Sequence, residues 1–130
     1  MLSNEFIGFM ATVLVVDDVD ENRMLLEYCL EDDGHIVWSE SGGAAAINRV
    51  KKEQPDIIFL DINMPIVDGF VFLYEFEKFN SYLRNKCKVI ILSSSDNKRD
   101  IDKIVNNDNV IKFITKPLTE NALEEIKSIG

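Results

Sequence analysis

The chain has 130 residues, of which 46% are hydrophobic and 28% charged, and its formal net charge is -9. These values are ordinary for one globular domain, and the acidic balance argues against nucleic-acid binding because phosphate backbones require a basic face. No apolar run approaches the length of a membrane span, and the first ten residues lack the basic region of a signal peptide, so we expect a cytoplasmic location.

The cysteines and the single histidine do not form a recognisable metal site. Cys29 and Cys87 lie in apolar surroundings without metal-ligand spacing, and we interpret both as reduced thiols. His35 has no second histidine or cysteine with which to bind zinc. We therefore expect His35, like the single tryptophan Trp38, to serve packing.

A short N-terminal segment precedes the first regular element. Residues 1–11 are interpreted as an extension, either irregular or a short added helix, and Met10 offers a second start of the chain. The remaining residues, 12–130, are expected to form one domain.

The first half of this domain alternates strands and helices. A β-branched apolar run at 12–16 is typical of a buried strand, and Asp17 and Asp18 follow it directly. Apolar residues then recur at helical spacing over 20–31. The next two elements are expected to be a strand over 35–38 and an alanine-rich helix over 43–52.

A central strand is predicted at residues 57–60, which are apolar at every position and follow Pro55. Such a run is typical of a strand buried on both faces of a parallel sheet. Asp61 comes next, and a turn with Pro65 and Gly69 precedes the following apolar segment. A carboxylate at the carboxyl end of a buried parallel strand lies where open α/β sheets place their ligands.

The second half continues the alternation. The segment 70–79 is rich in aromatic residues and is predicted to be a helix whose aromatic side chains pack in the core. Strands are expected at 88–92, before three consecutive serines, and at 110–114, before a Thr-Lys-Pro sequence. The two remaining helices are predicted over 96–106 and 119–128.

Five short strands alternating with five helices predict an α/β fold. Short connections between such elements favour a parallel sheet with helices on both faces, which gives three layers. Right-handed crossovers favour the strand order 2-1-3-4-5 at this length. We therefore predict a doubly wound (βα)5, flavodoxin-like fold.

Three carboxylates converge in this fold. Strands 1 and 3 are neighbours in the predicted order, so Asp17, Asp18 and Asp61 meet at one edge of the sheet. Like charges at close range repel, and a hard divalent cation removes the conflict. Mg²⁺ suits the site because it accepts one or two carboxylates, keeps waters and binds phosphate oxygens.

Two further side chains are expected at the same edge. The fourth strand delivers the hydroxyl of Ser93, and the fifth delivers the ammonium group of Lys116. A carboxylate nucleophile, a metal, a hydroxyl donor and a fixed cation are the components of phosphoryl transfer. Taken singly, each residue has a simpler explanation, such as a helix cap for Asp17 or Asp18. Their joint placement at four strand ends favours function.

The motifs resemble the receiver domain of two-component response regulators. The resemblance covers about residues 12–129 and rests on these features: Asp17-Asp18, Asp61 with the following Asn-Met-Pro, Asp68-Gly69, Ser93 and Lys116-Pro117. It implies that Asp61 is the phosphoacceptor, assisted by Ser93 and Lys116. It also implies that Asp18, Asp61 and the main-chain carbonyl of Asn63 ligate Mg²⁺, while Asp17 acts through a metal-bound water.

The resemblance further implies a switch formed by Ser93 and Phe113. Phosphorylation draws the serine hydroxyl toward the phosphate, the aromatic ring moves inward, and the face formed by 96–106, 110–114 and 119–128 changes. Because Phe113 has no hydroxyl, we expect its ring to favour the inward position at rest. The same face is where the family often forms homodimers.

The implied protein is a signalling domain rather than an enzyme, and its partner is a sensor histidine kinase or a histidine phosphotransfer protein. The sequence around Ser93 and Lys116 resembles that of stand-alone receivers. The alternative is a receiver of a hybrid histidine kinase or of a larger regulator, acting as a phosphorelay intermediate.

Other functions fit the sequence less well. An aspartate-based phosphatase needs Asp-x-Asp after strand 1 with the nucleophile first and a lid insertion, whereas this chain has Asp17-Asp18-Val-Asp20 and no such insertion. A flavodoxin-type electron carrier needs a phosphate-binding loop at the same place, where two acids would repel phosphate. A nucleotide-binding P-loop sequence is absent.

Overall fold

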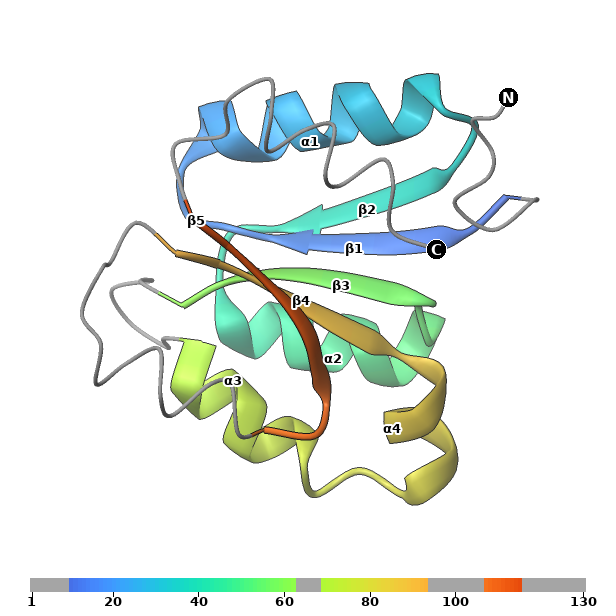
Figure 1. Cartoon of the computed structure of the whole chain (residues 1–130), viewed down its shortest axis with the longest axis vertical. Coiled ribbons are helices and arrows are strands. Elements are labelled where there is room, and N and C mark those ends of the chain that lie inside the picture. Colours follow the sequence, from blue (N-terminus) through green and yellow to red (C-terminus); the bar gives the residue numbers. More distant parts are fainter. Residues whose placement is uncertain (1–9, 63–68, 94–106, 116–130) are drawn as a thin grey trace.

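A five-stranded parallel sheet forms the centre of the computed structural model, which describes residues 10–62, 69–93 and 107–115 (Figure 1). The sheet order is β2-β1-β3-β4-β5, which confirms the predicted order. The strands are β1 (Thr12–Val16), β2 (Ile36–Glu40), β3 (Ile57–Asp61), β4 (Lys88–Ser93) and β5 (Val110–Thr115).

The two faces of the sheet form separate cores because successive strand residues point to opposite sides. Val13 and Val15 of β1 pack with Leu26 and Leu30 of α1 (Asp20–Asp32). Residues of the opposite parity, Leu14 and Val16 in β1, belong to a second core. That core is completed from α2 (Gly43–Glu53) and α3 (Gly69–Phe76) by Ala46, Val50, Phe72 and Phe76.

The layers follow directly from these cores. Figure 1 shows α1 on one side of the sheet and α2 and α3 on the other. The central strand β3 is buried at all five positions, as the continuous apolar run predicted. Trp38 is partly buried and packs against the second core, which confirms its interpretation as a packing residue.

The segment predicted as one helix over 70–79 is different in the structure. The helix α3 ends at Phe76, and a separate short helix, α4 (Ser81–Lys86), follows it. The side chain of Asn80 starts α4 because its Oδ1 accepts a hydrogen bond from the Leu83 N–H at 2.9 Å. The sequence pattern did not predict this second helix.

Two other boundaries differ in small ways. Strand β2 begins one residue later and ends two residues later than the predicted 35–38, at Glu40. The predicted helices over 96–106 and 119–128 lie outside the described residues, as does most of the N-terminal extension. The division into residues 1–11 and 12–130 stays a prediction.

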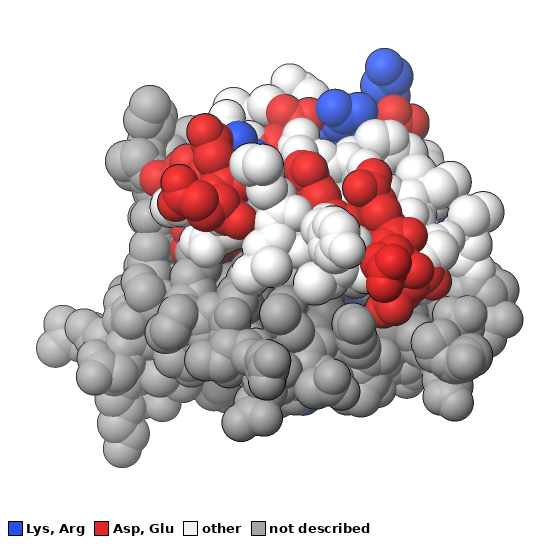
Figure 2. All heavy atoms as spheres, turned by 90° about the horizontal axis from the view of Figure 1, so that it is seen from above, with Lys and Arg blue, Asp and Glu red and all other residues white. Residues whose placement is uncertain are grey.

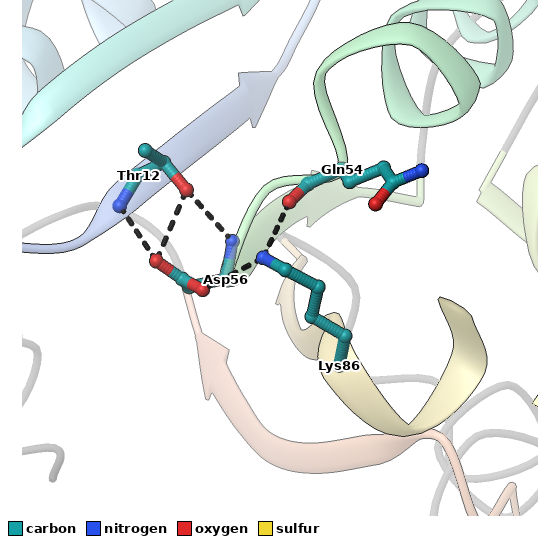
Figure 3. Close-up of polar contacts among 4 residues, drawn as sticks. All are labelled: Thr12, Gln54, Asp56 and Lys86. Atoms are coloured by element: carbon teal, nitrogen blue, oxygen red, sulfur yellow. Dashed lines mark hydrogen bonds and ion pairs between the residues drawn. The ribbon is translucent and has the colours of Figure 1, made fainter. Parts of the chain in front are cut away.

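A polar cluster closes the N-terminal edge of the sheet (Figure 3). One oxygen of Asp56, Oδ2, accepts hydrogen bonds from the N–H and the hydroxyl of Thr12, each at 3.0 Å. The other oxygen, Oδ1, accepts from Lys86 Nζ at 2.9 Å, and the same ammonium donates to the Gln54 carbonyl at 2.6 Å. The cluster thus joins the starts of β1 and β3 to the end of α4.

These contacts set the ionisation of Asp56. Burial alone raises the pKa of this carboxyl, but the hydrogen bonds from Thr12 and Lys86 lower it by more, and the net result is a pKa below the ordinary value. Asp56 is therefore held in its charged form by the fold.

Candidate metal site

Three carboxylates meet at the C-terminal edge of the sheet, as predicted. One potential ligand oxygen from each of Asp17, Asp18 and Asp61 lies within 4.8 Å of the others. Asp17 and Asp61 are buried, with 0% and 2% of their surface exposed, whereas Asp18 is exposed. The group therefore has two carboxylates inside the fold and one at the opening to solvent.

The topology brings these residues together. Strands β1 and β3 are parallel neighbours, with Val16 opposite Leu60, so the residues that follow these two positions leave the sheet side by side. Asp61 is the last residue of β3 and lies opposite Leu92 of β4. The chain after Asp61 continues this pairing for one more residue, since the Ile62 N–H donates to the Leu92 carbonyl at 3.2 Å.

Asp17 is fixed by its own main chain and side chain. Its N–H donates to the Glu40 carbonyl at 3.2 Å, and its Oδ1 accepts from the Val19 N–H at 2.9 Å. The N-cap of α1 is Val19, and no side-chain hydrogen bond caps this helix. The simple alternative that Asp17 or Asp18 is the helix cap is therefore wrong.

Gly69 packs closely against the main chain of Ile62, the residue after Asp61. Its N–H donates to the Ile62 carbonyl at 3.3 Å, and a Cβ atom at this position would lie 2.5 Å from the Ile62 Cα. Only glycine permits so close an approach of two main chains. A glycine at position 69 is thus required for packing next to the acidic residues.

The other predicted site residues are described only in part. Ser93 is fully buried at the end of β4, one residue beyond the position that faces Asp61. Phe113 lies in β5 opposite Ile91, partly buried and packed against the core that includes Ile91. Asn63 and Lys116 lie outside the described residues, so their predicted roles stay predictions.

The donor set fits a hard divalent cation. Three carboxylates supply only oxygen ligands, and one of them reaches solvent, so a bound ion can retain water and admit a further anionic ligand. Mg²⁺, Mn²⁺ and Ca²⁺ all accept such ligands. The cluster contains neither of the cysteines, and burial raises the pKa of the Cys87 thiol to about 11.

Sequence reasoning missed three charged residues around this edge. Arg23 donates from Nη1 to the Asp17 carbonyl at 2.8 Å. Glu40, whose carbonyl accepts from Asp17, has its carboxylate bound by Arg49, with Nε and Nη2 at 2.9 and 2.8 Å. A signal was available for Arg23, because no other lysine or arginine occurs among the first 48 residues.

Comparison with known families identifies the class of protein. The model of the response regulator receiver domain matches residues 13–127, so the chain belongs to the response regulator receiver domain family. This result confirms the resemblance found in the sequence. Receiver domains are signalling domains of two-component systems and act with histidine kinases or phosphotransfer proteins.

Solved structures share the fold. A two-component response regulator from Cytophaga hutchinsonii is 34% identical, with a TM-score of 0.76 over 88% of this chain and 92% of that one. The phosphorylated cyanobacterial phytochrome response regulator RcpA is 26% identical, with a TM-score of 0.77 over 92% of this chain and 90% of that one. These matches confirm the three-layer, flavodoxin-like fold.

A curated relative is much longer. The sensor protein GacS of Pseudomonas syringae pv. syringae is 27% identical over 114 residues, which are 88% of this chain but only 13% of that protein. The match therefore concerns one domain of a larger protein. Among the helices that the structure describes, none is both long enough and apolar enough to span a membrane.

Proposed function

We propose that the chain is a receiver that accepts a phosphoryl group from a phosphohistidine onto Asp61 and does so with Mg²⁺. The observation that supports this most directly is the cluster of Asp17, Asp18 and Asp61 at the end of the central strands. Membership of the receiver family, and the phosphorylated state named for the similar regulator RcpA, support the same chemistry.

The proposed step is a transfer between two residues. A carboxylate oxygen of Asp61 attacks phosphorus, the new P–O bond forms an acyl phosphate, and the P–N bond of the donor breaks with its electron pair left on the imidazole. Asp18, Asp61 and the main-chain carbonyl of Asn63 would ligate Mg²⁺, with Asp17 acting through a bound water. When bound, the ion neutralises charge on the transferred oxygens.

The remaining site residues complete the proposal. Lys116 pairs with the phosphoryl group, and the hydroxyl of Ser93 donates to it. Movement of Ser93 toward the phosphate frees space into which Phe113 turns, and the face that includes β5 changes for a downstream partner. We expect the same face to support a homodimer. The domain catalyses only its own phosphorylation and dephosphorylation.

The proposed phosphodonor is a sensor histidine kinase or a histidine phosphotransfer protein, and we expect the exchange in the cytoplasm. The match to GacS supports a second candidate, in which this domain is the receiver of a hybrid kinase or larger regulator and passes its phosphoryl group to a phosphotransfer protein. The two candidates share the chemistry at Asp61. They differ in whether the phosphoryl group leaves for another histidine.

Intact-mass measurement tests the shared chemistry. The chain is incubated with acetyl phosphate and Mg²⁺, and we expect the mass of one phosphoryl group to be added. The gain should disappear in Asp61→Asn and in the presence of a chelator. Asp108→Asn provides a matched control, because Asp108 is exposed in the turn before β5 and the charge change is the same.

Two results would contradict phosphorylation at Asp61. If the wild-type chain gains no phosphoryl group and also binds neither Mg²⁺ nor beryllofluoride, the acidic residues are not a phosphorylation site. A gain that persists in Asp61→Asn would assign the acceptor to another residue.

A further inference from the structure

Arg23 is the only lysine or arginine among the first 48 residues, which are strongly acidic. The first 48 residues contain ten aspartates and glutamates, one arginine and no lysine. Figure 2 shows the face above α1, on which acidic side chains predominate in the described region. Carboxylates and carbonyl oxygens near Arg23 are therefore its available partners.

The guanidinium of Arg23 connects the acidic site to the first turn of α1. Its Nη1 donates to the Asp17 carbonyl at 2.8 Å, and its Nη2 forms an ion pair with the carboxylate of Asp20. The Arg23 side chain is only 18% exposed, whereas that of Asp20 is 73% exposed. The arginine is therefore packed against the main chain of the site, and Asp20 holds it from the solvent side.

The main chain of Asp17 is also held on its N-terminal side, through the preceding peptide. The Asp17 N–H donates to the Glu40 carbonyl, and the Glu40 carboxylate is bound by two nitrogens of Arg49. Asp17 thus has its N–H fixed to the edge strand β2 and its carbonyl fixed to α1. The peptide that links Asp17 to Asp18 begins at this carbonyl, so its orientation determines where the exposed Asp18 carboxylate lies.

We propose that Arg23 is a positioning residue for the metal site, which orients the Asp17–Asp18 peptide so that both carboxylates face Asp61. This inference rests on the proposed function, because it assumes that the acidic cluster binds Mg²⁺. Groups that orient metal ligands contribute strongly to affinity, since ligands that are already in place lose little freedom on binding. Arg23 itself does not ligate the metal.

The direction of the change in Mg²⁺ affinity on substitution of Arg23 distinguishes a positioning role from a purely electrostatic effect. A guanidinium near three carboxylates repels Mg²⁺, so removal of its charge alone would tighten metal binding. Loss of a positioning contact would weaken binding. Lysine at position 23 keeps the charge but loses the planar, two-pronged donor geometry, so a charge effect predicts no change for this variant.

The experiment is a calorimetric titration of the full chain with Mg²⁺. We expect Arg23→Gln to weaken binding about tenfold and Arg23→Lys to weaken it about threefold, in line with the usual effect of groups that support metal ligands. Arg84→Gln is a matched control, because Arg84 Nε also donates to a main-chain carbonyl, that of Phe79 at 3.0 Å, but lies on α4. It should bind Mg²⁺ like the wild-type chain.

The outcomes are distinguishable. Unchanged or tighter binding in Arg23→Gln, with the wild-type chain binding normally, overturns the role of Arg23 and leaves the proposed function intact. If the wild-type chain binds no Mg²⁺, both fail together. Thermal unfolding without metal shows whether Arg23→Gln folds, and if it does not, the milder Arg23→Lys decides: unchanged affinity in that variant overturns the proposal.

Discussion

The two ends of β1 and β3 carry aspartates in opposite electrostatic settings. At the N-terminal edge, Asp56 receives two hydrogen bonds from Thr12 and one from the ammonium of Lys86. At the C-terminal edge, Asp17, Asp18 and Asp61 bring three like charges to within 4.8 Å of one another. At one end of this pair of strands, the negative charge of the carboxylate is balanced by hydrogen-bond donors and an ammonium group. At the other end, three carboxylates lie close together.

This difference indicates what each end does. A carboxylate that is bound by donors and a cation contributes to stability, whereas clustered carboxylates destabilise the fold unless something binds them. Sites that break the local rules of stability are typically functional. The N-terminal edge is therefore interpreted as structural and the C-terminal edge as functional, and each interpretation can be tested separately.

The largest expected effect on stability is at the N-terminal edge. We predict that Asp56→Ala lowers the free energy of unfolding by about 2 kcal/mol, because the hydrogen bonds from Thr12 to a charged acceptor are lost. The ion pair with Lys86 adds less, since the Asp56 side chain is 43% exposed and solvent screens the pair. Urea unfolding in the presence of a chelator measures this change.

Unlike stability, metal binding should not change in Asp56→Ala. Its affinity for Mg²⁺ should equal that of the wild-type chain, because the site lies at the other end of the strands. Asp108→Ala removes an exposed aspartate and controls for the change in net charge. A tenfold loss of Mg²⁺ affinity in Asp56→Ala would show that the two edges are coupled. A stability equal to that of the control would show that Asp56 does not stabilise the fold.

At the C-terminal edge, removal of a carboxylate should raise the stability of the metal-free chain rather than lower it. We predict that Asp18→Asn raises the midpoint of thermal unfolding by about 2–4 °C without metal, because one of three repelling charges is removed. The same variant should lose the stabilisation that Mg²⁺ gives to the wild-type chain. Differential scanning calorimetry with a chelator and with excess Mg²⁺ measures both effects.

Asp108→Asn is the control for Asp18→Asn as well, since it makes the same change in charge at an exposed position. We expect it to change the midpoint little and to keep the Mg²⁺ effect. A lower midpoint for Asp18→Asn without metal would mean that Asp18 stabilises the fold, and the contrast between the edges would fail.

The sequence predicted the sheet and the carboxylate cluster well, for a physical reason. Each buried strand is a short apolar run, and parallel order brings the residues after the neighbouring runs β1 and β3 together, so the meeting of Asp17, Asp18 and Asp61 followed from patterning alone. The roles of these residues in chemistry stay predictions. Asn63 and Lys116 were chosen by family resemblance and lie outside the described residues.

The features that sequence reasoning missed depend on contacts without a periodic signal. The helix α4 has only six residues and a largely polar sequence, so it shows no clear apolar face, although Asn80 was an available capping signal. The extension of β2 to Glu40 lacks a fully buried position because it is at the sheet edge. The bond from Arg23 ends on a main-chain carbonyl, which no sequence motif encodes.

A smaller effect is expected from His35, which also lies at the N-terminal edge. Its side chain is 6% exposed, and its Nδ1 accepts a hydrogen bond from the Ala11 N–H at 3.1 Å. Burial lowers the pKa of His35 below the ordinary value of 6.5, and the nearby Asp33 opposes this only in part. Protonation at Nδ1 would also place two donors against each other.

The lowered pKa of His35 gives a definite sign for the pH dependence. Below about pH 6.5 the unfolded chain binds a proton that the folded chain resists, so the free energy of unfolding falls as the pH falls through this range. Urea unfolding at several pH values between 7.5 and 5.5 should show a steeper loss for the wild-type chain than for His35→Asn, whose amide oxygen can accept the same hydrogen bond. Parallel profiles would mean that His35 contributes nothing to the pH dependence, and the N-terminal edge would then depend on Asp56 alone for its response to acid.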